Sequence, residues 1–255
     1  MDNTAATVPP RLWIYTNYDC NLRCSYCTVS SSPTAARREI SPPVFKRLID
    51  EATALGFKQV FLTGGEPFLL PAIISMLEYS LRRLPTVILT NGTLLNGRRM
   101  DKLVQLRNQP LTMQVSIDSA DPKVNDHYRG PGAWQKAFKG IVSLVENGFA
   151  VKVGATATPQ AEPVRDELVA FLTSLGVDEK NIFVRPLARR GICTQGKIYT
   201  KADLAPEVTI NYQGVYWHPL ATDDDLLVTP DIFPLEDAVN KFAQLTPGTE
   251  GTKFR

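Results

Sequence analysis

The sequence predicts an α/β fold in which six strand–helix units form an incomplete barrel, (β/α)6, followed by a small C-terminal cap made of a hairpin and a helix. Between residue 11 and about residue 187, short apolar runs alternate with amphipathic segments, as in parallel strands joined by helices. After about residue 195 this alternation stops, and two short apolar runs flank a Gln-Gly turn. We therefore divide the chain into a barrel domain, residues 1–195, and a cap, residues 196–255.

The elements follow in order along the chain. Six apolar runs predict strands at residues 12–16, 59–63, 86–90, 112–117, 151–155 and 182–186. The first helix is predicted from Ser41-Pro42, a favourable helix start, to Gly56. Apolar residues at helical spacing predict further helices at residues 73–81, 100–106, 137–145 and 168–175. In the cap, we expect strands at residues 209–212 and 215–217 and a helix at residues 235–242.

Composition limits the possible partners. The 255 residues include 28 Lys and Arg and 26 Asp and Glu, and the formal net charge of +2 offers no strong field for nucleic acid. No stretch approaches the roughly 20 apolar residues of a membrane helix, and the N-terminal residues lack the pattern of a secretory signal. We expect a cytoplasmic protein that binds neither nucleic acid nor membrane.

Chemically active side chains come directly after the predicted strands. In a parallel strand–helix array, the loops that leave the carboxyl ends of the strands meet at one rim. The loops with such side chains are residues 19–27, 64–67, 91–92, 118–129 and 189–193. The sequence therefore predicts a functional site at this rim.

Three cysteines lie in the first of these loops. The segment CNLRCSYC places Cys20, Cys24 and Cys27 close enough for one loop to wrap a compact inorganic centre. A structural zinc site or an electron-transfer cluster needs four protein ligands, whereas a cubane cluster with three leaves one iron open. Two alternatives remain at this point: zinc completed by Cys193 or a histidine such as His218, or three thiols that bind no metal.

Together with Tyr26, which precedes the last cysteine, this loop resembles the cluster loop of radical S-adenosylmethionine (SAM) enzymes. The resemblance extends over nearly all of residues 11–195. It implies a partial TIM barrel that holds a [4Fe-4S] cluster on the three cysteines. In that family the open iron chelates the amino and carboxylate groups of SAM.

Three further strand-end loops are similar to the loops that surround SAM in this family. In TGGEP, residues 63–67, Gly64 and Gly65 let backbone polar groups approach a ligand and Glu66 supplies a negative charge, and the resemblance implies that this loop holds the SAM ammonium. The loops LTNG, residues 89–92, and VSIDS, residues 115–119, are similar to elements that line the SAM pocket. The resemblance implies cofactor contacts at Asn91, Ser116 and Asp118, as it does at Tyr26 of the cysteine loop. Ser119 stands at a position where many relatives carry glycine.

The segment NDHYRGPGAW, residues 125–134, is similar to one found in the subgroup with peptide-modifying and molybdopterin-type members. The resemblance implies that Arg129 pairs with the SAM carboxylate, for which its planar fork of donors is suited. We expect His127 to make only hydrogen bonds within its loop.

The reaction is implied by the resemblance. An external electron donor such as flavodoxin or ferredoxin reduces the cluster, SAM is cleaved to methionine and a 5′-deoxyadenosyl radical, and the radical takes hydrogen from a small-molecule or peptide substrate. The family includes epimerases, dehydrogenases and enzymes that form or rearrange bonds. Cleavage of a different SAM bond, and a noncatalytic metal-binding regulatory module, are the alternatives. No leader-peptide-binding domain is recognisable, which favours small molecules or short peptides.

Residues 211–232 resemble the SPASM and twitch caps that carry auxiliary clusters. Where those relatives place a cysteine in the hairpin, this chain has Tyr216-Trp217-His218-Pro219, and no cysteine follows in the sequence. We therefore expect a degenerate cap that covers the substrate and binds no auxiliary cluster.

Cys193 follows the sixth predicted strand and is expected near the rim. Some radical SAM epimerases resemble this arrangement, because one cysteine quenches the substrate radical, and Cys193 would then be the hydrogen donor of an epimerisation. The alternative is a cysteine that only packs in the interior. At the same end, Arg185, Arg189 and Arg190 could bind a substrate carboxylate or phosphate.

Overall fold

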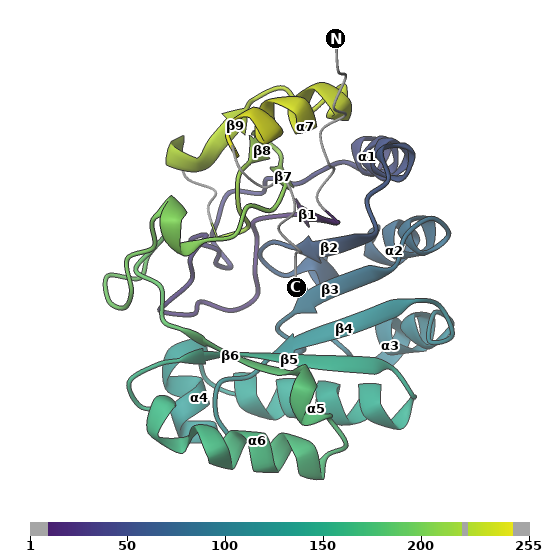
Figure 1. Ribbon diagram of the computed structural model, residues 1–255. Helices are drawn as coiled ribbons and strands as arrows, with labels where there is room; N and C mark the ends of the chain where they lie inside the picture. The colour runs from purple at the N-terminus through teal and green to yellow at the C-terminus, as the bar shows by residue number, and fades with distance from the viewer. Residues whose placement is uncertain (1–9, 221–223, 247–255) are drawn as a thin grey trace.

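The computed structural model describes residues 10–220 and 224–246. Within these residues, nine strands form one sheet in the order β6-β5-β4-β3-β2-β1-β7-β8-β9 (Figure 1). The strands are β1 (Arg11–Tyr15), β2 (Gln59–Thr63), β3 (Thr86–Thr90), β4 (Leu111–Ser116), β5 (Ala150–Ala157), β6 (Ile182–Pro186), β7 (Thr209–Asn211), β8 (Gly214–Tyr216) and β9 (Leu227–Thr229). Strands β1 to β6 are parallel, as the sequence predicts for an incomplete barrel.

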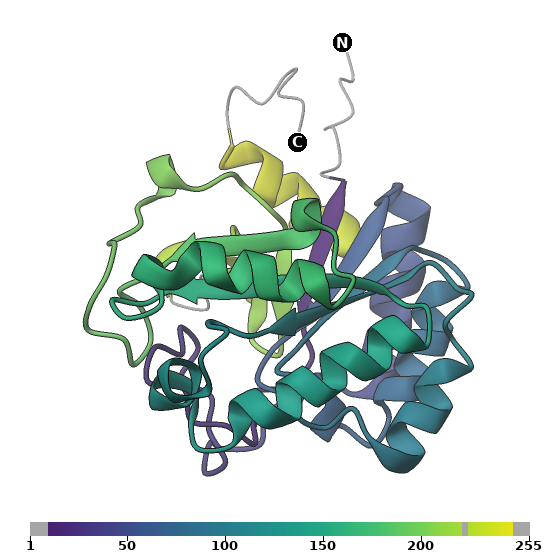
Figure 2. The same cartoon turned by 90° about the horizontal axis from the view of Figure 1, so that it is seen from below.

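Most of the helices cover the outer face of this sheet, and one short helix, after the fourth strand, lies at its loop-bearing end (Figures 1 and 2). They are α1 (Pro42–Leu55), α2 (Ile73–Leu81), α3 (Gly97–Val104), α4 (Pro122–Arg129), α5 (Ala133–Glu146), α6 (Arg165–Ser174) and α7 (Leu235–Gln244). Leu12 and Ile14 of β1 point toward the helices and are fully buried in the main core. Trp134 of α5 stacks on Phe171 of α6, which joins the two helices that lie side by side in Figure 2.

Helix α4 corrects the expectation of a loop after the fourth strand. The Asp121 carboxylate accepts a hydrogen bond from the Lys123 N–H at 2.8 Å, and Pro122 occupies the first turn. Both features favour the start of a helix at this point. The segment lacks an apolar stripe, because the residues it buries are Asn125 and Arg129. Strand β9 was also missed, because its three residues are too few for a recognisable pattern.

A small second core lies on the inner face of the barrel. The Trp13 ring stacks on the Phe61 ring with 4.3 Å between centroids, and Val87 and Leu89 pack against them. Side chains alternate along a strand, so the next inward residues of β1 and β2 belong to the carboxyl ends of the strands. This apolar layer therefore fills the barrel beneath the rim and leaves the rim for a cavity.

The C-terminal segment continues the sheet of the barrel. Strand β7 pairs in parallel with β1, where Trp13 lies opposite Thr209. The Trp13 indole N–H donates to the Glu207 carboxylate, which also forms an ion pair with Arg11 at 2.6 Å. Helix α7 is linked to α1 because the Leu235 N–H donates to the Glu51 carboxylate at 2.6 Å. The division of the chain at residue 195 stays a prediction.

None of the helices in the described ranges combines the length and the apolar character that a transmembrane segment needs.

We predict that Ile210→Ala destabilises the whole fold. Ile210 is fully buried in β7, between β1 and β8, so the truncation should lower the free energy of unfolding by about 2–5 kcal/mol. Urea unfolding of the cofactor-free chain under anaerobic conditions measures the change. As a control, Ile198→Ala should cost less than about 0.5 kcal/mol, because Ile198 is 63% exposed. Equal effects of the two changes would contradict the integration of the cap into the barrel.

Candidate active site

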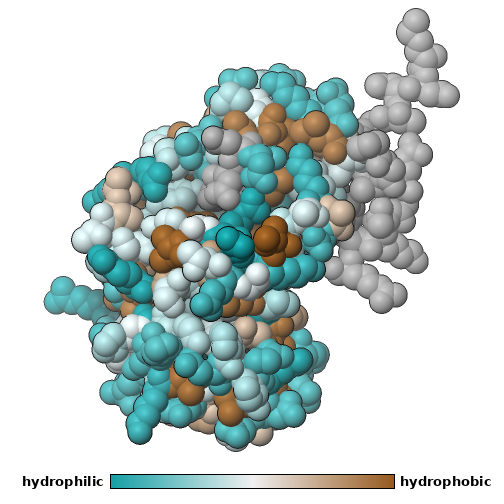
Figure 3. Space-filling model, turned by 90° about the vertical axis from the view of Figure 1, so that its left-hand side faces the viewer, coloured by the Kyte–Doolittle hydropathy of each residue, from teal (hydrophilic) through white to brown (hydrophobic). Residues whose placement is uncertain are grey.

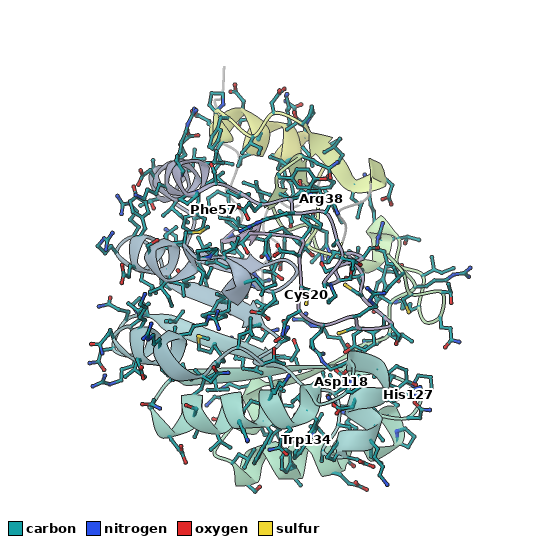
Figure 4. The ribbon with its side chains drawn as sticks, turned by 180° about the vertical axis from the view of Figure 1, so that it is seen from behind. Cys20, Arg38, Phe57, Asp118, His127 and Trp134 are labelled. Carbon is teal, nitrogen blue, oxygen red and sulfur yellow. The ribbon has the colours of Figure 1, made fainter. Side chains whose placement is uncertain are left out.

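A cavity of about 300 Å³ opens where the barrel strands end. Its walls come from the cysteine loop, from the ends of β2 to β6 and from the cap. In Figure 4, Cys20 and Asp118 lie at this end of the sheet, and the surface of the loop-bearing side is largely hydrophilic with apolar residues in separate groups (Figure 3). The predicted site residues that line the cavity are Cys20, Cys24, Tyr26, Cys27, Gly64, Gly65, Asn91, Ser116 and Arg129.

The three loop cysteines are free thiols that surround one side of this cavity. Hydrogen-bond donors are directed at two of the sulfurs. The Cys20 Sγ accepts from the Leu22 N–H at 3.4 Å and from the Asn91 amide at 3.7 Å, and the Cys27 Sγ accepts from the Ser31 N–H at 3.2 Å. Such donors hold and tune the sulfur ligands of iron–sulfur clusters.

Burial, with smaller contributions from the nearby Glu66 and Cys24, raises the pKa of Cys20 to about 12 against the opposing hydrogen bonds from Leu22 and Asn91. Burial also raises the pKa of Cys24, although the charge of Arg129 opposes this. These thiols therefore favour the protonated form until a cation compensates the thiolate charge.

The donor set distinguishes between the kinds of metal centre. Within the described ranges, no three His, Cys, Asp or Glu side chains come close enough together to hold a single metal ion. Neither Cys193 nor His218 belongs to the described residues that line the cavity. A cubane cluster gives each thiolate a separate iron, so its ligands must surround a space rather than converge on one point. The three thiols around a shared cavity fit a [4Fe-4S] cluster and do not form the alternative zinc site.

The two glycines of the TGGEP loop let its backbone touch the backbone of the cysteine loop. The Gly65 N–H donates to the Asn17 carbonyl at 2.8 Å, and the Glu66 N–H donates to the Asp19 carbonyl at 2.9 Å. A Cβ atom at Gly65 would lie 2.1 Å from the Asp19 oxygen, and one at Gly64 would lie 2.3 Å from the Asn17 oxygen. The sequence suggested glycines for ligand approach, and the structure adds a second reason, the contact between the two loops.

Glu66 connects the end of β2 to the end of β3. Its carboxylate accepts from the Asn91 N–H at 2.7 Å, the Phe68 N–H at 3.0 Å and the Thr90 hydroxyl at 2.8 Å. Burial raises the pKa of Glu66, while these three donors lower it. Glu66 is not among the described residues that line the cavity, so a direct contact with SAM stays a prediction.

Asn91 joins the third strand to the cysteine loop. Its side-chain amide donates to the Asn21 side-chain Oδ1 at 2.9 Å as well as to the Cys20 sulfur, and its own Oδ1 accepts from the Thr93 N–H at 2.9 Å. Ser116 lines the cavity from the end of β4. The structure thus brings both predicted residues to the site and gives Asn91 an additional role in positioning a cysteine.

A buried polar network connects the cysteine loop with β4 and α4. The Tyr26 hydroxyl donates to the Asp118 carboxylate and accepts from the Arg129 Nη1 at 2.7 Å. The same nitrogen lies 3.5 Å from the other Asp118 oxygen, which also accepts from the Thr156 N–H at 2.9 Å. Sequence reasoning assigned these three side chains to SAM separately and missed their bonds to one another, because no local pattern reports a contact between distant segments.

Electrostatics keep this network in one charge state. Burial raises the pKa of Tyr26, which remains a neutral phenol. Burial alone would lower the pKa of Arg129, but Tyr26, Asp118 and Cys24 raise it well above its ordinary value. Arg129 therefore stays positively charged and faces the cavity, where it can pair with an anionic group.

Two other candidates lie outside the cavity. Cys193 is buried and its thiol donates to the Gln195 carbonyl at 3.3 Å, but the adjacent Ile192 N–H donates to the Cys27 carbonyl at 3.2 Å. The donor role of Cys193 stays a prediction. His127 is exposed and its ring lies edge-on against Tyr128, away from the cysteines in Figure 4.

The family model described as the radical SAM superfamily matches residues 14–172. The chain belongs to the radical SAM superfamily. Enzymes of this superfamily use a [4Fe-4S] cluster and SAM, and the thiols and cavity of this radical SAM chain fit both.

Two relatives are similar in sequence to part of the chain. It is 34% identical over 158 residues to the AdoMet-dependent heme synthase of Methanosarcina barkeri, which is 60% of this chain and 44% of the relative. It is 33% identical over 136 residues to AlbA, the antilisterial bacteriocin subtilosin biosynthesis protein of Bacillus subtilis, which is 52% of this chain and 30% of the relative. The chain thus spans less than half the length of these relatives.

A solved structure of native anSMEcpe with bound AdoMet and Cp18Cys peptide has the same fold, with a TM-score of 0.67. The match covers 93% of this chain and 83% of that one, although only 12% of the residues are identical. It therefore supports the partial barrel and extends over the C-terminal cap.

We predict that Gly65→Ala disturbs cluster assembly. The new Cβ would collide with the Asp19 backbone, and a close-packed interior has no space for the added methyl group. The cysteine loop must therefore shift, and cluster content should fall below about half of the wild-type value. Iron and sulfide analysis after anaerobic reconstitution measures the loss. Gly148→Ala is the control for general destabilisation: its φ of 76° makes the substitution strained, but a Cβ there meets no atom within 4 Å, so cluster content should stay near the wild-type value. Wild-type cluster content in the Gly65 variant would disprove the structural role of this contact.

Proposed function

We propose that the chain is the catalytic part of a radical SAM enzyme in which Cys20, Cys24 and Cys27 hold the [4Fe-4S] cluster. The observation that carries the proposal is the cavity shared by three free thiols and by the TGGEP loop, with hydrogen-bond donors on the sulfurs. When bound, the cluster and SAM supply a 5′-deoxyadenosyl radical that can take hydrogen from an unactivated carbon.

The residues of the chain then bind and orient SAM. The loop of Gly64 and Gly65 supplies backbone polar groups, and Asn91 and Ser116 line the neighbouring wall. Arg129, held by Tyr26 and Asp118, presents a fixed positive charge to the SAM carboxylate. Because the side chains are held by the buried network, they need little rearrangement when the cofactor binds.

We propose a peptide or a small molecule as the substrate. A peptide is supported by two similar proteins, a bacteriocin biosynthesis protein and an enzyme with a bound Cp18Cys peptide. The reaction also needs an external one-electron donor such as flavodoxin or ferredoxin. The free thiols of the cluster site favour a reducing compartment, and we keep the cytoplasm as the proposed location.

The decisive experiment is SAM cleavage by the reconstituted chain. We expect iron–sulfur charge-transfer absorption, a spectral change on addition of SAM, and release of 5′-deoxyadenosine with dithionite. Cys24→Ala should abolish all three because it removes a proposed ligand, whereas Cys193→Ala should keep them. A zinc centre, or a cluster whose spectrum is indifferent to SAM, would refute the proposal, and cleavage of another SAM bond would appear as a different product.

Epimerisation is a narrower proposal for the same site. It is supported by the packing of the segment that carries Cys193 against the third cluster cysteine: the Ile192 N–H reaches the Cys27 carbonyl, and Gly191 abuts Thr28. The Cys193 thiol would give a hydrogen atom to the substrate radical, and the resulting thiyl radical would take an electron from the external donor and a proton.

We predict that Cys193→Ala still consumes SAM but does not complete the product, because the substrate radical loses its hydrogen source. The measurement is deuterium incorporation from D₂O into the substrate by mass spectrometry. Wild-type chain should incorporate solvent deuterium and the variant should not. Unchanged product formation by the variant would discard the donor role.

A further inference from the structure

Two polar side chains that line the cavity, Gln114 and Arg185, are not part of the proposed cofactor site. Gln114 points inward from β4 and is only 5% exposed, yet its amide makes no hydrogen bond to any described residue. Buried amides are almost always hydrogen-bonded to protein or to ordered water, and the Gln114 amide is not among the described side-chain atoms that are both fully buried and unpaired, so it reaches the open cavity. The Gln114 amide is therefore available to a ligand in the cavity.

The neighbouring strand leaves room for such a ligand. Gly154 of β5 also lines the cavity, and a Cβ atom at this position would lie 3.1 Å from the Gln114 Nε2. A larger residue would press against the amide. The glycine thus keeps the Gln114 amide accessible from the cavity.

Arg185 supplies the charge on the other side of this space. It lines the cavity from the end of β6 and forms no ion pair with a described residue. The Arg185 charge acts on the Glu207 carboxylate, but Glu207 is already engaged by Arg11 and Trp13. Arg185 therefore retains a positive charge that faces the cavity.

Within the described part of the chain, the other charged groups around Arg185 do not compensate this charge. Arg190 is held by the Asp225 carboxylate at 2.9 Å and 3.1 Å. Burial, together with Arg185 and Arg190, lowers the pKa of His218 to about 4, so this histidine is neutral near pH 7. The charge on this side of the cavity favours an anion.

We propose that the cavity binds a substrate with an anionic oxygen group, a carboxylate or a phosphate, at Arg185, and a second polar group at Gln114. Strands β4 and β6 are separated by β5, where Gln114 lies opposite Lys152 and Arg185 lies opposite Thr156, four residues further along. The two residues are therefore about 16 Å apart at the backbone, which suits an extended ligand that reaches both side chains rather than a single ion. The inference rests on the proposed function, because it places the substrate beside the SAM site.

Binding can be tested without turnover. Isothermal titration calorimetry of the SAM-loaded, reconstituted chain at constant ionic strength would use glutarate, inorganic phosphate and neutral glutaramide as probes. We expect an anionic probe to bind at least about tenfold more tightly than glutaramide. Preference for glutarate or for phosphate identifies the anionic group.

Matched variants assign the binding to the two residues. Arg185→Gln should weaken the preferred anion by about tenfold or more, whereas Arg189→Gln, at an exposed arginine outside the cavity lining, should not. Gln114→Leu should weaken glutarate while cluster content stays at the wild-type level, which separates a binding role from a folding defect.

The outcomes separate this inference from the function on which it rests. Absence of anion binding, or equal losses in the two arginine variants, would overturn the inference even if the chain releases 5′-deoxyadenosine. Anion binding that depends on Arg185, in a chain that never cleaves SAM, would overturn the proposed function and leave the anion site in place.

Discussion

The contact between two backbones at the rim of the barrel determines the site. The TGGEP loop lies directly on the cysteine loop, because Gly64 and Gly65 carry no Cβ atoms and the Gly65 and Glu66 N–H groups donate to the Asn17 and Asp19 carbonyls. The Glu66 carboxylate then attaches this pair of loops to the end of β3, and Asn91 extends the connection back to the Cys20 sulfur. The loop of three cysteines is thereby held against the ends of the barrel strands, which suits a cofactor that needs fixed ligands.

Charge at the site is controlled by burial and by reciprocal hydrogen bonds. Tyr26 bridges Asp118 and Arg129, and the Thr156 N–H binds the same carboxylate, so the end of β5 joins a network that begins in the cysteine loop. A buried charge without such partners would be costly, whereas this one is paired and hydrogen-bonded. The network can therefore keep a cationic side chain beside the cofactor without losing the fold.

The cap makes the cavity asymmetric. Strand β7 extends the barrel sheet beyond β1, and the Tyr15 hydroxyl donates to the Pro219 carbonyl, so the cap residue Leu220 reaches the cavity wall. The cysteines occupy the side of the cysteine loop, and Arg185 occupies the side of β6 and the cap. The barrel thus separates a region suited to the cofactor from a region suited to a substrate, as in other barrels whose chemistry is built on strand-end loops.

The sequence by itself determined the order of the elements and the rim on which the chemistry lies. Apolar alternation located the six parallel strands, and the spacing of Cys20, Cys24 and Cys27 indicated the metal centre, because both depend on residues close together in the chain. Helix α4 was not predicted, because it buries Asn125 and Arg129 and has no apolar stripe.

Only the tertiary structure decided which distant side chains meet. It showed that Glu66 bonds to the neighbouring strand, that Tyr26 joins Asp118 to Arg129, and that Gln114 faces the cavity without a partner among the described residues. These contacts link segments tens of residues apart, and hydrogen-bond geometry between such segments is set by the packing of the whole barrel rather than by any local pattern.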